Sequence, residues 1–222
     1  MKNSSKFNSL FFLFLSFFGT NFSYAGTLYE FEFTPLVMVE ENNRFYGSFD
    51  FTHPVNPFSC SFLFFSSFEK NFPKKIKGFS TYGTYAERDQ EFDSNGHLFL
   101  LENGEWLIQF DHVPDPGCIN LGERFKEGPE DQYFHSFKLK QKKSVLGIRM
   151  IGVKKSFFYK KNGENLERKK TYLVASDVVV ALKEFREFQL IQYRNPKSAL
   201  VTFGWIKKNN LINPFPKDWQ KN

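Results

Sequence analysis

"SALVTFGWIKKNNLINP", residues 198–214, decides the fold of the second half of this chain. Apolar residues alternate with other residues up to Gly204 and Trp205, which is the period of a half-buried β-strand. Two lysines and two asparagines follow, and Asn209 and Asn210 favour a short helical turn because their side chains can bond to nearby backbone groups. The stretch therefore predicts a strand, a tight turn and a short last strand that begins at Leu211.

The residues before this stretch complete the pattern of a small β-barrel. An opening strand ends in the aromatic run at residues 157–159 ("FFY"), and a polar loop follows over residues 160–169. The segment "TYLVASDVVVALKEF" then places Asp177 in a turn before a β-branched run, and "FQLIQY" and "RNPKS" supply a further strand and a turn. In this order of features, residues 151–212 resemble the bacterial branch of the Src homology 3 family, although the two residues before Asp177 replace the usual Lys-Gly pair.

The resemblance implies a small barrel and a class of partner. Family members that grip proline-rich peptides use an aromatic groove, but the corresponding positions here are Phe188, Lys207 and Asn210. Two of these three are polar, so we expect no proline-rich ligand. For the bacterial branch, the resemblance implies attachment to peptidoglycan or to a protein of the cell envelope. The residues expected to bind lie at one end of the barrel: Tyr159, Lys160, Lys161, Trp205, Lys207 and Lys208, with the first two lysines in the polar loop.

Charge is divided unevenly along the chain. Residues 26–136 contain 8 Lys and Arg against 18 Asp and Glu, whereas residues 137–222 contain 20 against 6. This asymmetry predicts an acidic domain over residues 26–136 and a basic one over residues 137–222, with either mutual attraction or an anionic partner. The competing interpretation of the basic half is that Trp205 is a core residue and that the lysines are merely solvated.

The acidic half shows the period of two that is typical of antiparallel strands. Turn signals separate the strands, as at "ENN" (41–43), "DSNG" (93–96), "ENG" (102–104) and "VPDPG" (113–117). We predict an antiparallel β-sandwich or barrel with one disulfide, followed by the small barrel, so that the chain is all-β. The side chains expected to share buried faces are Tyr29, Phe31 and Phe33, then Phe45, Phe49 and Phe51, and then Trp106, Ile108 and Phe110.

The first 25 residues have the features of a cleaved signal peptide. Lys2 and Lys6 form a positive start, and "LFFLFLSFFG" is an apolar run that is short for a membrane span. Small residues at Ser23 and Ala25 mark a cut after Ala25, and an uncleaved anchor is the alternative. We therefore expect a periplasmic or secreted protein with no membrane span in the mature chain.

Export makes the two cysteines informative, because an oxidising compartment favours disulfides. Cys60 and Cys118 are the only cysteines, and we expect them to be bonded to each other. A catalytic thiol is the alternative, but neither cysteine stands in a recognisable arrangement with a histidine.

Other chemistry has weak support. Residues 91–102 nearly fit a calcium loop, but Glu91 stands where a shorter Asp is needed, and the flanking residues predict strands rather than helices. Asp111, His112 and Asp115 could meet at a metal, although loop residues held near a disulfide explain them more simply. The chain has no phosphate-binding glycine loop and no serine elbow, and no pair of acidic residues stands out. We expect no metal, no cofactor and no enzymatic activity.

These features predict an exported, non-enzymatic protein of a bacterial envelope whose basic barrel recognises an acidic partner, either peptidoglycan or a protein. The alternative is a periplasmic immunity or inhibitor protein whose acidic half faces a basic toxin or lytic enzyme. A cell-wall hydrolase is a third hypothesis, for which no nucleophile, metal set or base stands out. Nucleic acid is not expected as a partner, because the protein is expected to be exported.

Overall fold

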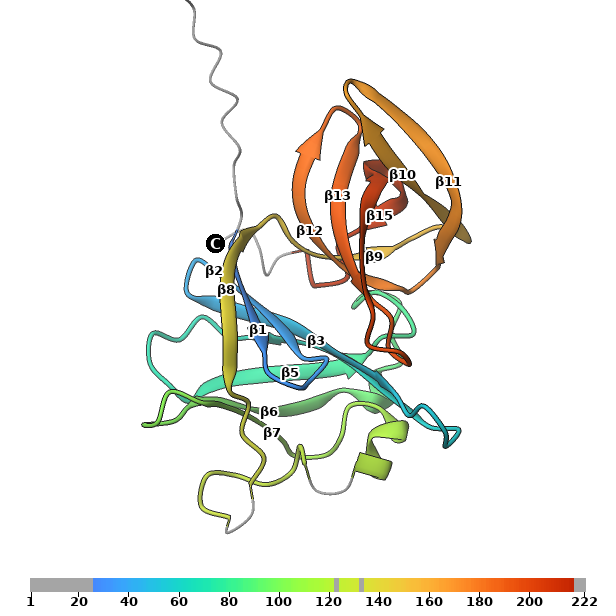
Figure 1. The fold of residues 1–222 in the computed structure, drawn as a ribbon. Helices are drawn as coiled ribbons and strands as arrows, with labels where there is room; N and C mark the ends of the chain where they lie inside the picture. Colours follow the sequence, from blue (N-terminus) through green and yellow to red (C-terminus); the bar gives the residue numbers. More distant parts are fainter. Residues whose placement is uncertain (1–25, 122–123, 132–133, 218–222) are drawn as a thin grey trace, which may run out of the picture.

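Two antiparallel β-sheets make up the fold of residues 26–121, 124–131 and 134–217, which are the residues that the computed structural model describes (Figure 1). The prediction of an all-β protein is confirmed. The expected signal peptide and its cut after Ala25 lie outside the described residues. In the part of the chain that is described, no helix is long and apolar enough to cross a membrane.

The first sheet has eight strands in the order β7-β6-β5-β4-β3-β2-β1-β8. Seven consecutive strands form a meander, and β8 returns from a long connection to pair with β1. The strands are β1 (Gly26–Phe31), β2 (Val37–Glu41), β3 (Arg44–Thr52), β4 (Ser59–Ser66), β5 (Lys74–Ser80), β6 (Ser94–Leu100), β7 (Trp106–Phe110) and β8 (Leu139–Val145).

One face of this sheet packs an aromatic core. Tyr29, Phe31, Phe45 and Phe49 are buried in it, as the period of two predicts. Trp106, Ile108 and Phe110 join them from β7, and Phe51 packs partly against the same cluster. The prediction for Phe33 is wrong, because β1 ends at Phe31 and Phe33 is fully exposed in a left-handed backbone conformation with φ 53°.

The sequence predicts one turn of the meander correctly and another wrongly. Asn42 and Asn43 have φ of 51° and 61°, as a tight hairpin between β2 and β3 requires, so the turn at residues 41–43 is confirmed. The turn at residues 93–96 is wrong, because Ser94, Asn95 and Gly96 already belong to β6. A side chain at Gly96 would clash with the carbonyl oxygen of Gln109. This glycine therefore marks a close approach of two strands and not a turn.

The second sheet has seven strands in the order β11-β10-β14-β13-β12-β9-β15, and it curls strongly (Figure 1). The quoted stretch forms β14, a 3₁₀ turn (Lys208–Asn210) and β15, as the sequence predicts. The strands are β9 (Gly147–Ile151), β10 (Lys155–Asn162), β11 (Asn165–Val174), β12 (Val178–Phe185), β13 (Phe188–Arg194), β14 (Val201–Lys207) and β15 (Leu211–Ile212).

One detail of the second sheet differs from the prediction. Residues 160–169 are no loop, because β10 and β11 form one long hairpin that turns at Gly163 with φ 58°. Lys160 and Lys161 therefore lie in β10. Gly204 is needed for packing, since a side chain there would clash with the ring of Phe158 in the core of this sheet.

The change from the first sheet to the second falls at Leu146, between β8 and β9. The change of charge places a domain boundary earlier, at residue 137, and β8 is as basic as the strands that follow it. Its partner is nevertheless the acidic first sheet, in which Tyr29 is opposite Lys142 and Glu30 is opposite Gln141. Lys143 lies 3.1 Å from Glu30 across these strands, so opposite charges of the two halves meet within one sheet.

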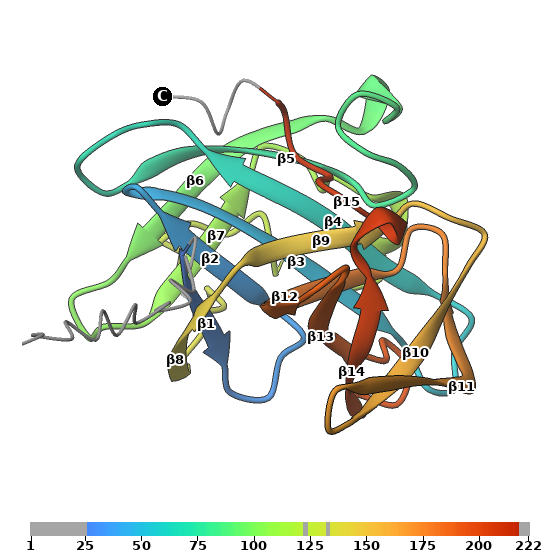
Figure 2. The same ribbon diagram turned by 90° about the horizontal axis from the view of Figure 1, so that it is seen from above.

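The two sheets share an apolar core. Tyr46, Leu63 and Phe79 lie on the face of the first sheet that is opposite its aromatic core. They pack against Ile148 and Met150 of β9. Figure 2 shows β9 passing over β3 and β4, in agreement with these contacts. The second sheet therefore sits on the first, as Figure 1 shows from the side, and the two form a single packed body.

Candidate binding surface

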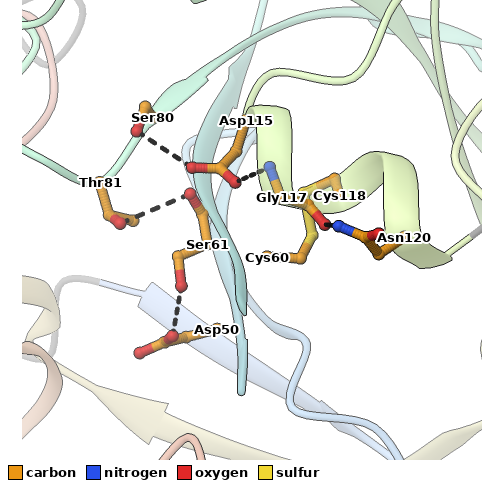
Figure 3. The surroundings of a disulfide bond; sticks show 9 residues. All are labelled: Asp50, Cys60, Ser61, Ser80, Thr81, Asp115, Gly117, Cys118 and Asn120. Carbon is orange, nitrogen blue, oxygen red and sulfur yellow. Dashed lines mark hydrogen bonds between the residues drawn. A yellow bond between two sulfur atoms is a disulfide. The ribbon is translucent and has the colours of Figure 1, made fainter. Parts of the chain in front are cut away.

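The disulfide corner is structural. Cys60 of β4 is bonded to Cys118 of a 3₁₀ segment (Pro116–Leu121), so the predicted disulfide is confirmed and the cysteines are not catalytic thiols (Figure 3). Asp115 fixes this segment: its carboxylate accepts hydrogen bonds from the Gly117 amide at 2.8 Å and the Ser80 hydroxyl at 3.4 Å. Asp115 therefore holds the disulfide loop, as its place in the sequence indicates.

In the region that resembles a calcium loop, basic side chains of the protein pair with the central carboxylate. The Asp93 carboxylate lies 2.6 Å from Arg88 Nε and 3.1 Å from Lys77 Nζ. Glu91 belongs to a 3₁₀ turn (Gln90–Phe92), and the residues after Asp93 extend along β6. Within residues 26–121, 124–131 and 134–217, no three His, Cys, Asp or Glu side chains are grouped so as to hold a metal ion. We therefore assign no calcium site to these residues.

Three partly or fully buried carboxyl groups with raised pKa lie in β3, in the disulfide loop and before β12: Asp50, Asp115 and Asp177. Burial raises the pKa of Asp50 in β3, and the carboxylates of Asp177 and Asp115 raise it further. Burial also raises the pKa of Asp177, although its carboxylate accepts a hydrogen bond from the Val174 amide at 2.7 Å. The Ser61 hydroxyl donates to Asp50 at 2.5 Å (Figure 3). Each of these acids accepts hydrogen bonds from donors inside the fold, so we interpret them as structural groups.

We expect the Asp50→Asn variant to lose less stability than the wild type as the pH rises from about 4 to 7. A raised pKa means that folded Asp50 binds more protons than the unfolded chain in this window, so ionisation costs stability as the pH rises. Asparagine removes this cost and can still accept the Ser61 hydrogen bond. Urea unfolding at several pH values measures the effect, with exposed Asp111→Asn as the control. Equal pH slopes for Asp50→Asn and the wild type would contradict the assignment.

The six residues predicted to bind lie near one end of the second sheet, and the structure brings five of them together with new neighbours. Tyr159 of β10 is the strand partner of Trp205 of β14, and Lys207 is the partner of Phe188 of β13. Lys160 projects from the opposite face of β10, because side chains alternate along a strand. We call the following residues the aromatic–lysine cluster: Tyr159, Lys161, Lys183, Phe185, Arg186, Phe188, Trp205, Lys207 and Lys208.

Cations in the cluster lie over aromatic rings. Lys161 Nζ is 3.4 Å from the ring centroid of Phe185, and the Arg186 guanidinium is 4.9 Å from the same ring. Lys183 Nζ lies 6.0 Å from the Trp205 ring, which in turn lies 5.9 Å from Phe185. A ring face attracts a cation, so these contacts fix ammonium groups that would otherwise move freely. The result is a surface that combines positive charge with aromatic area.

Two cations of the cluster are already neutralised. Arg186 pairs with Glu164 at 2.7 Å, and Lys208 pairs with Glu184 at 2.5 Å. The pair lowers the pKa of the Glu184 carboxyl, chiefly through the hydrogen bond from Lys208. Lys161, Lys183 and Lys207 have no carboxylate partner among the residues that the structure describes. These three lysines therefore supply the uncompensated charge of the cluster.

The aromatic members serve mainly as support. Trp205 is 8% exposed and Phe188 is 5% exposed, and the Phe188 ring packs on Tyr159 at 4.8 Å. This agrees with the interpretation of Trp205 as a core residue, whereas Tyr159 and Phe185 are half-buried. Sequence analysis missed Lys183, Phe185 and Arg186, although the alternation in "LKEFREF" shows that Lys183 and Phe185 share a face.

Neither protein-family models, curated proteins nor solved structures gave a match to this chain. The likeness of residues 151–212 to the bacterial Src homology 3 family therefore stays a prediction.

Proposed function

We propose that this chain is an exported envelope protein that binds an acidic partner through the aromatic–lysine cluster. The observation that carries the proposal is the set of lysines without carboxylate partners in the described residues around Phe185 and Trp205, of which Lys161 and Lys183 lie over these rings. The basic excess of the second half, 20 Lys and Arg against 6 Asp and Glu, extends the positive potential around the cluster. Such a potential attracts anionic partners and raises their association rate.

A binding role fits the side chains better than a catalytic one. The acids with raised pKa, Asp50, Asp115 and Asp177, hydrogen-bond to Ser61, Ser80 and backbone amides. Each of these carboxylates is thus engaged in the fold, whereas lysines of the cluster have no carboxylate partner in the described part of the chain. Carboxylate-bearing peptidoglycan is the partner that we propose to test first, because an exported protein would meet it and its charge is complementary to the cluster.

Replacing Lys161 and Lys207 by glutamate is expected to weaken binding to purified peptidoglycan about tenfold at low salt, and less at high salt, because ions screen the exposed charges. The measurement is co-sedimentation with sacculi at two salt concentrations. The matched control is Lys169→Glu/Lys170→Glu on β11, which makes the same change of charge outside the cluster.

Unchanged binding of a folded Lys161→Glu/Lys207→Glu variant would remove the cluster as the contact. Equal losses in the cluster variant and the β11 control would show that net charge, and not this surface, governs binding. Absence of wild-type binding to sacculi, together with capture of an acidic protein that the cluster variant fails to capture, would assign the surface to a protein partner.

A further inference from the structure

A polar crevice lies at the junction of the two sheets, at the other end of β14 from Lys207. It has a volume of about 130 Å³ and is formed by side chains from β1, β8, β13 and β14. The first sheet supplies Glu30, Lys140 and Lys143, and the second supplies Arg194, Val201 and Phe203. Since β8 belongs to the first sheet, this crevice exists only where the two sheets pack together.

The wall of the crevice is held by a network around Glu30. The Glu30 carboxylate, 5% exposed, accepts a hydrogen bond from Gln192 Nε2 at 2.6 Å and lies 3.1 Å from Lys143 Nζ. Gln141 donates to the same carboxylate, and Lys143 donates to Gln192 at 2.7 Å. Burial opposes ionisation of Glu30, but these donors outweigh it and hold its pKa below the ordinary value. Lys143 is therefore neutralised inside the wall.

Two cations of the crevice have no such partner. Lys140 is exposed, and neither it nor Arg194 forms an ion pair with any residue that the structure describes. Arg194 Nε is buried and has no hydrogen-bond acceptor in the described part of the chain. The Arg194 guanidinium therefore lines the crevice without an acceptor in the described residues, and a bound anion would supply one. The lining contains one carboxylate, Glu30, and three cations, Lys140, Lys143 and Arg194, so its net charge is +2.

The remaining side of the crevice is apolar and open. Phe203 is 52% exposed and Val201 is 40% exposed. These side chains offer a flat surface beside the cations, so a ligand with only charge would leave them in water. The lining therefore fits an anionic group next to an aromatic or apolar body.

We propose that this crevice is a second binding site, which takes a carboxylate attached to an aromatic or apolar group. The guanidinium of Arg194 binds the carboxylate, because its fork of N–H donors matches two carboxylate oxygens. Lys140 adds a second positive charge, and the body of the ligand lies on Phe203. The volume suits an end group of a ligand and not a whole drug-sized molecule. This inference does not depend on the function proposed for the aromatic–lysine cluster.

The test is titration of the full mature chain with N-acetylphenylalanine and with its primary amide, followed by two-dimensional NMR. We expect the carboxylate to shift the amide signals of Gln192, Val201 and Phe203 at millimolar concentration, and the amide analogue to bind at least about tenfold more weakly. Equal affinity for the two compounds, or shifts confined to other parts of the protein, would overturn the proposal.

Variants separate this site from the cluster and from effects on folding. Lys140→Gln should weaken binding of N-acetylphenylalanine about tenfold, and because Lys140 is exposed its fold should be intact. Arg194→Gln should abolish detectable binding. The matched control is Lys142→Gln, which removes a lysine of the same strand that lies over the Tyr29 ring, 4.5 Å from its centroid. Wild-type affinity in Lys140→Gln would refute the site, whereas Lys161→Glu/Lys207→Glu should bind the probe normally.

Discussion

Removing the disulfide by replacing Cys60 and Cys118 with alanine is expected to lower the free energy of unfolding by about 4 kcal/mol. The bond closes a loop with a sequence separation of 58 residues, and this closure restricts the unfolded chain. The measurement is urea unfolding of the double variant beside the oxidised wild type. A shift of the midpoint equivalent to less than about 1 kcal/mol would contradict this estimate.

The position of the bond indicates which part of the protein its loss affects first. Between β7 and β8 the chain has no strand in its described residues, yet Phe125 and Phe137 from this connection are buried in the aromatic core. Cys118 anchors the connection to β4, and Asp115 provides only hydrogen bonds in addition. Hydrogen exchange in the reduced protein should therefore rise first near Phe125. The amides of β9 and β12, whose side chains lie in the other two cores, serve as the internal control.

Periodicity predicts individual strands because it reports burial of one face. Phe45, Phe49, Trp106 and Ile108 lie where the alternation places them. Phe33 continues the same alternation, but the strand ends before it, and nothing in the pattern marks that end. Periodicity therefore does not show where a strand ends or which sheet the strand joins. The pairing of basic β8 with β1 is an example, because its charge resembles that of the second half.

The two candidate sites differ in the same way, because one depends on local sequence patterns and the other on contacts between distant segments. The sequence predicts that Tyr159, Lys161, Trp205 and Lys207 lie at one end of a small barrel, although it places Lys161 in a loop and not in β10. Contacts between distant segments were not predictable in this way. Gln192 bonds to Glu30 across 162 residues, and no local pattern records that contact. The crevice at the junction depends on how the two sheets pack, so it is visible only in the structure.

One aromatic residue near the end of the described chain contributes to the core that the two sheets share. Phe215 is 4% exposed, and its ring lies 4.8 Å from the ring of Tyr46 and 6.3 Å from that of Phe79. The carbonyl oxygen of Pro214 accepts a hydrogen bond from the Tyr85 amide at 2.8 Å. The segment after β15 thus returns to the first sheet and fastens the second sheet to it.

Phe215→Ala is expected to lower the free energy of unfolding by about 3 to 5 kcal/mol, because it leaves a cavity in the core that the two sheets share. Urea unfolding measures the loss, and tryptophan fluorescence follows both halves, through Trp106 in the first sheet and Trp205 in the second. The matched control is Phe203→Ala, which deletes the same ring at a 52% exposed position and should cost far less. If the two variants lose equal stability, Phe215 does not fasten the sheets. If Phe215→Ala alone is strongly destabilised and both sheets unfold in one transition, the two sheets depend on each other for stability, because Phe215 belongs to the core that they share.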